Sequence, residues 1–242
     1  MTKVVFMGEK PLAKKCLQYL RRLKDVEILG VCTRKPTKNV WWGEQVVRKY
    51  CIAKGIPIIE RKKILEFEEV DVIISVLYPF VIEKEILDKA KIAAVNLHQA
   101  PLPHYKGCNS VSHAIMNGEK EYGVTLHLMN EELDSGDIIE RKMFPINDDI
   151  TARELYELAD KYCFEVFKRN IKNILRGEFR TFKQEKHIKS HIYPRNSLQN
   201  KQVDLSWPPE KIYNFVRGLD FPPFEKAYIM VGDKKIYLST RS

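Results

Sequence analysis

Short apolar runs alternate with amphipathic helical stretches over the first two thirds of the chain, and this alternation constrains the fold more than any other feature. The apolar runs are residues 4–7, 26–32, 57–59, 71–77 and 93–97. Helical spacing of apolar residues occurs at 12–23, 44–54, 83–90 and 111–116. The run at 71–77 is almost entirely apolar, which is typical of a strand covered on both faces. The sequence therefore predicts the α/β class, with a Rossmann-like, mostly parallel sheet flanked by helices.

The pattern changes after residue 120. Residues 124–129 and 138–144 have strand character, and the acidic loop that joins them leaves no room for a helix. Thr151 and Glu154 form the capping-box pattern, which predicts that a long helix begins here. Farther on, the sequence predicts a short helix and a β-hairpin, at 210–216 and at 227–231 with 235–238. We expect a catalytic domain and a small C-terminal lobe that contains the hairpin, over 1–180 and 181–242.

The chain is basic, and its charge is concentrated. It has 41 Lys and Arg against 32 Asp and Glu, a formal net charge of +9. Residues 163–201 alone hold ten basic side chains against three acidic ones. A basic balance fits a nucleic acid, an anionic membrane surface or a phosphorylated small molecule as partner. Because residues 168–189 begin on the long predicted helix, we interpret most of this charge as a solvated helix face.

Composition and spacing exclude several classes of protein. A hydrophobic content of 44% indicates a globular chain. No apolar run is long enough for a bilayer span or a signal peptide, so we expect a cytoplasmic protein without a membrane partner. The five cysteines lack C-x-x-C spacing, which favours reduced thiols. The spacing of His98, His104, Cys108 and His113 matches no standard ligand pattern, so we expect no metal.

The most informative segment lies at the end of the last predicted parallel strand. Asn96 and His98 are two residues apart, so their side chains project from the same face. Ligands bind beyond the carboxyl ends of the strands in an open α/β sheet. An amide beside an imidazole can polarise a carbonyl group and move a proton, and Asp134 in the acidic loop could orient or charge the histidine. Each residue alone also fits a structural role, since Asn and Asp often form turns.

Four segments are specific when taken together. They are Asn96-Leu97-His98, 102–107 (LPHYKG), 123–127 (GVTLH) and 133–137 (LDSGD). This set resembles the signature of the N10-formyltetrahydrofolate-dependent formyltransferases, over about residues 1–176 and more loosely in the tail. The resemblance implies an N-formyltransferase in which Asn96, His98 and Asp134 are catalytic, and it places the family's conserved histidine of the following strand at His127.

The same resemblance implies the formyl donor and its pocket. The donor is N10-formyltetrahydrofolate, which is released as tetrahydrofolate, and no metal takes part. In the family, the folate pocket is lined by the segment after the fourth strand and by the acidic loop. In this chain those segments supply Tyr78, Pro79, Phe80, Val81, Ile82, Asn130, Glu131 and Leu133.

Departures from the common family pattern favour one branch. Residues 100–103 read Ala-Pro-Leu-Pro, where glycinamide ribonucleotide and methionyl-tRNA formyltransferases usually have Ser-Leu-Leu-Pro. Together with Gly107 and Asn109, this version is similar to the sugar N-formyltransferases. The implied partner is an amino sugar attached to a nucleoside diphosphate, and our first choice is dTDP-4-amino-4,6-dideoxyglucose. Such dTDP-linked 4-amino-4,6-dideoxyhexoses serve cell-surface polysaccharides such as the lipopolysaccharide O-antigen.

We predict acceptor contacts near the catalytic residues and in the tail. Lys10 or Arg195 would bind the diphosphate, and the nucleobase would stack on Trp207 or Tyr193. The Trp41-Trp42 pair is either a core anchor or an exposed stacking platform. The predicted acceptor contacts are Lys10, Gln99, Pro103, Tyr105, Gly107, Asn109, Tyr193, Arg195 and Trp207.

Alternatives stay open at this point. A methionyl-tRNA formyltransferase-like enzyme is the second choice, although roughly 55 residues after Lys186 are few for the C-terminal β-barrel of the tRNA enzyme. The alternative that is not an enzyme is a protein that binds RNA through its basic lobe. The intact catalytic set argues against it, and we expect no nucleic acid partner. A homodimer is also open, because residues 221–224 and the hairpin could form an interface or pack on the core.

Overall fold

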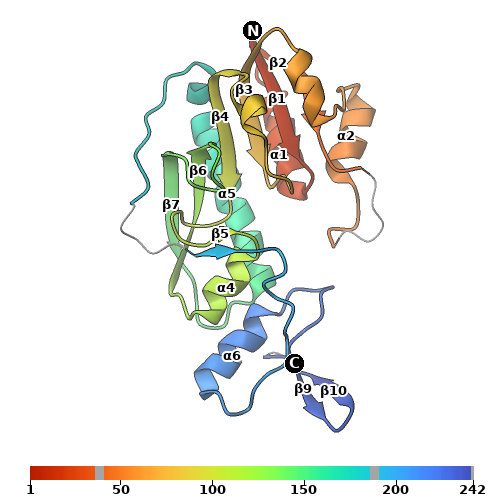
Figure 1. Cartoon of the computed structure of the whole chain (residues 1–242), viewed down its shortest axis with the longest axis vertical. Coiled ribbons are helices and arrows are strands. Elements are labelled where there is room, and N and C mark those ends of the chain that lie inside the picture. The colour runs from red at the N-terminus through yellow and green to blue at the C-terminus, as the bar shows by residue number, and fades with distance from the viewer. Residues whose placement is uncertain (36–40, 186–190, 241–242) are drawn as a thin grey trace.

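The computed structural model describes residues 1–35, 41–185 and 191–240 (Figure 1). The strands are β1 (Thr2–Gly8), β2 (Val26–Cys32), β3 (Val70–Val76), β4 (Ala90–His98), β5 (Lys106–Gly107), β6 (Glu121–Leu128), β7 (Ile138–Pro145), β8 (Ile192–Tyr193), β9 (Tyr228–Val231) and β10 (Lys234–Tyr237). The helices are α1 (Pro11–Leu20), α2 (Val46–Lys54), the 3-10 helix η1 (Arg61–Glu66), α3 (Lys84–Leu87), α4 (Ser110–Met116), α5 (Ala152–Leu175) and α6 (Pro209–Gly218).

One six-stranded sheet, in the order β2-β1-β3-β4-β6-β7, organises the molecule. Strands β2, β1, β3 and β4 are parallel, while β6 pairs antiparallel with β4 and β7 antiparallel with β6. The β6–β7 pairing follows from the sequence, because two strands joined by a short loop without a crossover run in opposite directions. The antiparallel β4–β6 pairing was not predicted, since helix α4 lies between these two strands in the chain. The predicted mostly parallel sheet, its flanking helices and the C-terminal hairpin are confirmed.

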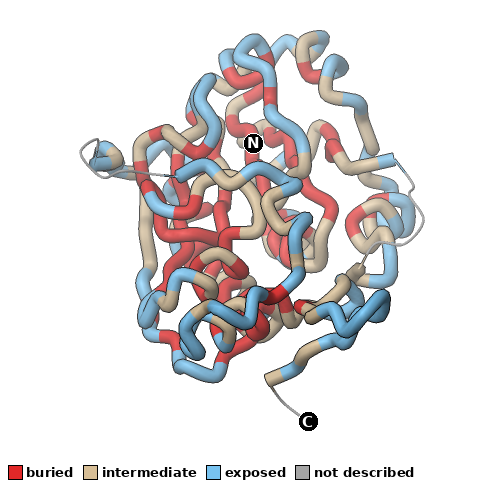
Figure 2. Tube along the Cα trace, turned by 60° about the horizontal axis from the view of Figure 1, so that its bottom comes forward, coloured by how far each residue is buried: buried red, intermediate tan, exposed pale blue. Residues whose placement is uncertain are grey.

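Both faces of the sheet are covered. Along β1, Val4 and Phe6 lie in a core cluster with buried residues of α1 and α5, whereas Val5 and Met7 lie in a second cluster with residues of η1 and α3. Figure 2 shows buried residues along the strands through the centre of the molecule. Because both faces of the sheet are packed, the ends of the strands are held in place. The candidate site described below lies at those ends.

Three predicted elements differ in the structure. Residues 57–59 form only a bridge from Ile58 to Val31, because the chain turns into η1 directly afterwards. The helix predicted at 83–90 is limited to α3, since Ala90 already pairs with Val70 in β4. The helix predicted at 12–23 ends at Leu20, after which the chain makes tighter turns.

The segment after residue 190 carries α6, the β9–β10 hairpin and a small third cluster of buried residues, which are Val203, Val216, Leu219 and Ala227. Helix α6 lies against α4, where a Cβ on Gly218 would be 2.9 Å from the Met116 side chain. The domain boundary near residue 180 stays a prediction. Across the described residues, no helix combines the length and the apolar character that a membrane crossing requires.

Candidate active site

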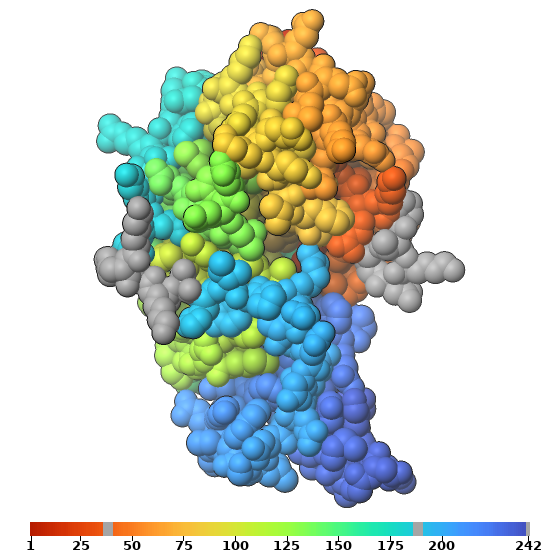
Figure 3. Space-filling view, in the orientation of Figure 1, coloured from red at the N-terminus to blue at the C-terminus, as the bar shows by residue number. Residues whose placement is uncertain are grey.

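A cavity of about 820 Å³ opens at the carboxyl ends of β1, β3 and β4. Lys10 follows β1, residues 77–82 follow β3, and His98 ends β4. The acidic loop between β6 and β7 forms another wall. The last wall comes from the segment after residue 190, which Figure 3 shows in blue against the yellow residues that follow β3. The strand ends at which the sequence places the site therefore border this cavity.

Asn96 is held by a histidine on the neighbouring strand. The β4–β6 register places it opposite His127, and its Nδ2 lies 3.1 Å from His127 Nε2. His127 Nδ1 lies 2.7 Å from the Leu128 carbonyl, so Nδ1 carries the proton and Nε2 accepts from the Asn96 amide. Burial lowers the pKa of His127 to about 4, which keeps this ring neutral at pH 7. The second N–H of Asn96 is left for a group in the cavity.

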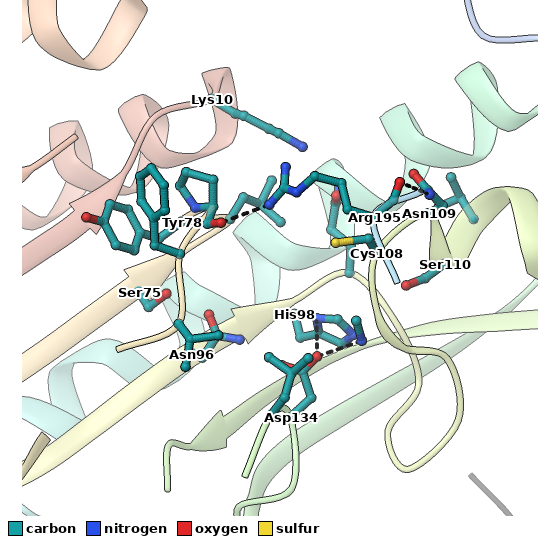
Figure 4. A pocket seen from close by; sticks show the side chains of 18 of the residues that line it. Lys10, Ser75, Tyr78, Asn96, His98, Cys108, Asn109, Ser110, Asp134 and Arg195 are labelled. Carbon is teal, nitrogen blue, oxygen red and sulfur yellow. Dashed lines mark hydrogen bonds and ion pairs between the residues drawn. The ribbon is translucent and has the colours of Figure 1, made fainter. Parts of the chain in front are cut away.

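His98 presents one ring nitrogen to a carboxylate. Its Nε2 lies 3.2 Å from the Tyr105 carbonyl and donates to it, which leaves Nδ1 as the acceptor nitrogen. That nitrogen faces Asp134, with 3.7 Å between Nδ1 and Oδ2. Both side chains are largely buried. Figure 4 shows Asp134 directed at His98. The other oxygen of this carboxylate, Oδ1, lies 3.8 Å from His127 Nε2.

Two glycines allow the Asp134 loop to approach the strand ends. The Gly107 amide donates to Asp134 Oδ2 at 2.9 Å, and Gly107 has a φ of +88°. A Cβ on Gly136 would be 1.9 Å from the Leu128 carbonyl oxygen, so no other residue fits this position without a shift of the backbone. Gln184 Nε2 donates to the carbonyls of Asp134 and Gly136, which fixes the loop from outside.

One wall of the cavity offers an apolar slot. All eight residues predicted to line the folate pocket border the cavity. Phe80, Val81 and Leu133 are 48%, 66% and 44% exposed, although they are apolar. Arg61 Nη1 donates to the Val81 carbonyl at 2.6 Å and supports the loop that carries two of them. Exposed apolar side chains from two facing loops indicate a site for a flat, largely apolar ligand.

The predicted acceptor contacts divide into two groups. Lys10, Gln99, Gly107, Asn109 and Arg195 border the cavity. The others lie outside its lining, and these are Pro103, Tyr105, Tyr193 and Trp207.

The two aromatic residues predicted to stack a nucleobase are already engaged. Tyr193 stacks on His113 with ring centroids 3.8 Å apart, and Trp207 packs on Phe215 beneath the Lys211 ammonium. The aromatic residues that do border the cavity include Trp41, Phe221 and Phe224. The Trp41 ring packs edge-on against Phe221 at 4.8 Å, so it is both an anchor and part of the wall. The sequence did not predict that Phe221 and Phe224 border the cavity. It indicated only that residues 221–224 form an interface or pack on the core.

Lys10 lies in the cavity just before α1, next to the buried carboxylate of Glu9, which is ion-paired with Arg34. The Lys10 ammonium lies 5.3 to 5.9 Å from the ring centroids of Trp41, Trp42 and Tyr156, and burial lowers its pKa. Within the described residues, no carboxylate lies within ion-pair distance of Lys10 or Arg195. The described part of the chain also contains no cluster of three side chains able to hold a metal ion.

An amide donor, an imidazole and a facing carboxylate lie together at the strand ends of an α/β sheet, and this arrangement suits chemistry at a carbonyl carbon. The sequence profile of the family described as Formyl transferase matches residues 2–169. The chain belongs to this family and is an N-formyltransferase, as the motifs predict.

Similar proteins come from two branches of the family. The methionyl-tRNA formyltransferase of Clostridioides difficile strain 630 is 32% identical over 244 residues, which cover 96% of this chain and 77% of that protein. The N-formyltransferase of Helicobacter canadensis, solved in complex with folinic acid and dTDP-3-aminofucose, is 27% identical with a TM-score of 0.81 and covers 98% of this chain and 86% of its own. The methionyl-tRNA formyltransferase of Clostridium thermocellum has a TM-score of 0.68 at 18% identity, with coverage of 100% and 93%.

Replacing His127 by phenylalanine is expected to lower kcat about 10- to 100-fold with little change in KM, because Asn96 loses the acceptor that orients its amide. His127→Gln can accept the same hydrogen bond through its side-chain oxygen and should retain more activity. Steady-state kinetics at pH 7, with thermal unfolding as a check on folding, compare the two variants. Equal losses in both would show that Asn96 is not oriented through His127.

Proposed function

We propose that this enzyme transfers the formyl group of N10-formyltetrahydrofolate to the primary amine of a sugar linked to a nucleoside diphosphate. The observation that carries the proposal is the pair of cations at one end of the cavity. Lys10 and Arg195 point toward each other above Asn96 and His98, and neither is ion-paired with a described carboxylate (Figure 4). Two cations without carboxylate partners beside a catalytic centre fit a diphosphate.

The apolar slot fits the folate. Tyr78–Ile82 and the acidic loop would hold the pterin and benzoyl rings between Phe80, Val81 and Leu133. When bound there, the donor supplies an electrophilic formyl carbon beside Asn96 and His98. The folinic acid in the Helicobacter canadensis relative supports a folate donor for this chain as well.

The hydrogen-bond pattern supports the following catalytic roles, in which His98 acts as the general base and not as a second donor to the oxyanion. The free N–H of Asn96 donates to the formyl oxygen, on which negative charge develops during attack by the amine. His98 Nδ1 takes the proton that the amine loses and can return it to the leaving nitrogen. Asp134 stabilises the imidazolium in between, since its Oδ2 lies 3.7 Å from Nδ1.

We further propose that the nucleotide is dTDP, with the sugar and base reaching toward the C-terminal wall. Phe221 and Phe224 offer rings for stacking, while Asn196, Gln199 and Glu225 offer polar atoms for the edge of a base. The dTDP-3-aminofucose bound by the Helicobacter canadensis relative supports this nucleotide. The sequence prediction places the amine at C4 of a 4,6-dideoxyhexose, whereas that relative binds a 3-amino sugar.

A panel of dTDP-linked 3-amino and 4-amino deoxyhexoses, with UDP-linked counterparts, tests the proposal. Incubation with N10-formyltetrahydrofolate should yield the formamido sugar, detected by mass spectrometry, together with tetrahydrofolate. The UDP sugars should react more slowly. If every amino sugar stays unmodified while the enzyme still binds folinic acid, the proposed acceptor is wrong.

The second candidate acceptor is methionyl-tRNA, because the Clostridioides difficile relative is named as a methionyl-tRNA formyltransferase. The described part of the C-terminal segment holds β8, α6 and the β9–β10 hairpin. Formylation of charged initiator tRNA under the same conditions distinguishes the two. The cytoplasmic location, the homodimer and a role in cell-surface polysaccharides stay predictions.

Replacing Lys10 by methionine is expected to weaken dTDP binding about 10-fold, because the nearly isosteric side chain keeps the contacts with the aromatic rings and removes the charge. Isothermal titration calorimetry with dTDP measures the change. Lys14→Met on α1, which lies outside the cavity lining, is the matched control and should bind dTDP as the wild type does. Equal affinity in the Lys10 variant would place the diphosphate elsewhere.

A further inference from the structure

Arg195 spans the cavity between its two halves. Its Nη2 donates to the Pro79 carbonyl at 2.8 Å, so a residue of the C-terminal segment is bonded to the loop that follows β3. Figure 4 shows the side chain crossing from the Asn109 side to the Tyr78 side, above His98 and Asn96. The loop carries residues predicted to line the folate pocket, and the Lys10 side chain extends toward the same guanidinium.

The backbone that carries Arg195 is firmly attached to the catalytic part of the molecule. Strand β8 pairs with β5, and the Cys108 amide donates to the Tyr193 carbonyl at 2.8 Å. Asn109 Nδ2 donates to the Arg195 carbonyl and to Ser197 Oγ, both at 3.1 Å. His113 Nε2 lies 2.7 Å from the same Ser197 hydroxyl. The Arg195 backbone is therefore fixed on one wall of the cavity, while its guanidinium is hydrogen-bonded to Pro79 on another wall.

The guanidinium has capacity for a second ligand. It carries five N–H donors in a planar fork, and the bond to Pro79 uses one of them. Among the described residues, no carboxylate is ion-paired with it. An edge of the fork is thus available for two parallel hydrogen bonds to a phosphate group while the bond to Pro79 stays in place.

We propose that Arg195 couples the binding of the two substrates. This proposal rests on the proposed sugar nucleotide acceptor. A diphosphate bound to the free edge holds the guanidinium in position, and the guanidinium then holds the 78–82 loop in the conformation that receives the folate. Each ligand therefore raises the affinity for the other, and linkage requires the two effects to be equal.

The test uses dTDP and folinic acid, which contain no acceptor amine and no transferable N10-formyl group. Calorimetry measures the Kd of folinic acid for the full chain alone and in saturating dTDP. For the wild type, dTDP should lower this Kd about fivefold, and folinic acid should lower the Kd of dTDP by the same factor. Arg195→Lys keeps a charge for the diphosphate but replaces the planar fork, whose separate edges reach Pro79 and the phosphate, by a single nitrogen. The ratio of its folinic acid Kd without and with dTDP should therefore be close to one.

Arg180→Lys is the matched control, since Arg180 is exposed and lies outside the cavity lining, and it should keep the wild-type ratio. If the wild type binds both ligands but its Kd for folinic acid is the same with and without dTDP, the coupling is refuted and the proposed acceptor is not affected. An Arg195→Lys variant with the full wild-type ratio overturns it as well. A wild type that binds folinic acid but no dTDP refutes the acceptor, and the coupling is refuted with it.

Discussion

Asp134→Asn is expected to lower kcat by about 10²- to 10⁴-fold while KM for either substrate changes little. Asparagine keeps the size of the side chain and an oxygen that can accept from the Gly107 amide, so the loop keeps its position. The charge is lost, and with it the stabilisation of a protonated His98 ring that faces the carboxylate at 3.7 Å. The measurement is single-turnover formyl transfer under saturating substrates.

The matched control is Asp148→Asn, which removes an exposed carboxylate that pairs with Lys120 outside the cavity. This variant should keep the wild-type rate. His98→Asn should lose about as much as Asp134→Asn, and the double variant should lose little more, because the two residues act as one unit. A rate within threefold of wild type for a folded Asp134→Asn protein would remove Asp134 from the reaction.

Between about pH 4 and pH 7, the unfolding free energy of Asp160→Asn is expected to rise relative to that of the wild type. The difference between the two proteins should change by about 3 kcal/mol over this range. Burial raises the pKa of Asp160 to about 7, whereas the same carboxyl titrates near its ordinary value of 3.8 in the unfolded chain. In this window the unfolded chain releases its proton first, so the wild type loses unfolding free energy as the pH rises. Asparagine carries no charge at any pH and can still accept the 2.6 Å hydrogen bond from Gln99.

Urea unfolding of both proteins at pH 4.5, 6 and 7.5 measures this difference. His113 and His127 act in the opposite direction, because burial lowers both pKa values to about 4 and stability is lost as the pH falls below about 6.5. Both proteins contain these histidines, so subtraction isolates Asp160. A difference that stays constant from pH 4.5 to 7.5 would show that Asp160 titrates normally.

The spacing of apolar residues was sufficient to predict the sheet, because this spacing reflects whether a strand is buried on one face or on both. Strands such as β1 and β3 are buried along most of their length, and their apolar runs are visible without any knowledge of the partner strand. Short elements depend on tertiary pairing instead. Ala90 could have ended a helix by its local sequence, but it joins β4 because Val70 is available beside it.

The site was predictable where its residues are close in sequence or match a family motif. Asn96 and His98 share a strand face, and the acidic loop that carries Asp134 belongs to a recognisable motif. Aromatic contacts were not predictable, since spacing does not show which ring an aromatic side chain will meet. Tyr193 lies on His113, and the cavity receives Phe221 from a segment that sequence analysis assigned to an interface or to core packing.

The walls of the cavity come from stretches of chain that are separate in sequence. Asn96, His98, Asp134 and the folate loops all lie within residues 2–169, which the family profile covers. The wall with Arg195, Phe221 and Phe224 comes from residues after 190. With the proposed roles, the reacting groups and the folate loops belong to the part of the chain that the family profile covers, whereas the acceptor would contact both this part and the tail. Exchanging the tail between relatives is therefore expected to alter which amino sugar is accepted while the formyl donor stays the same.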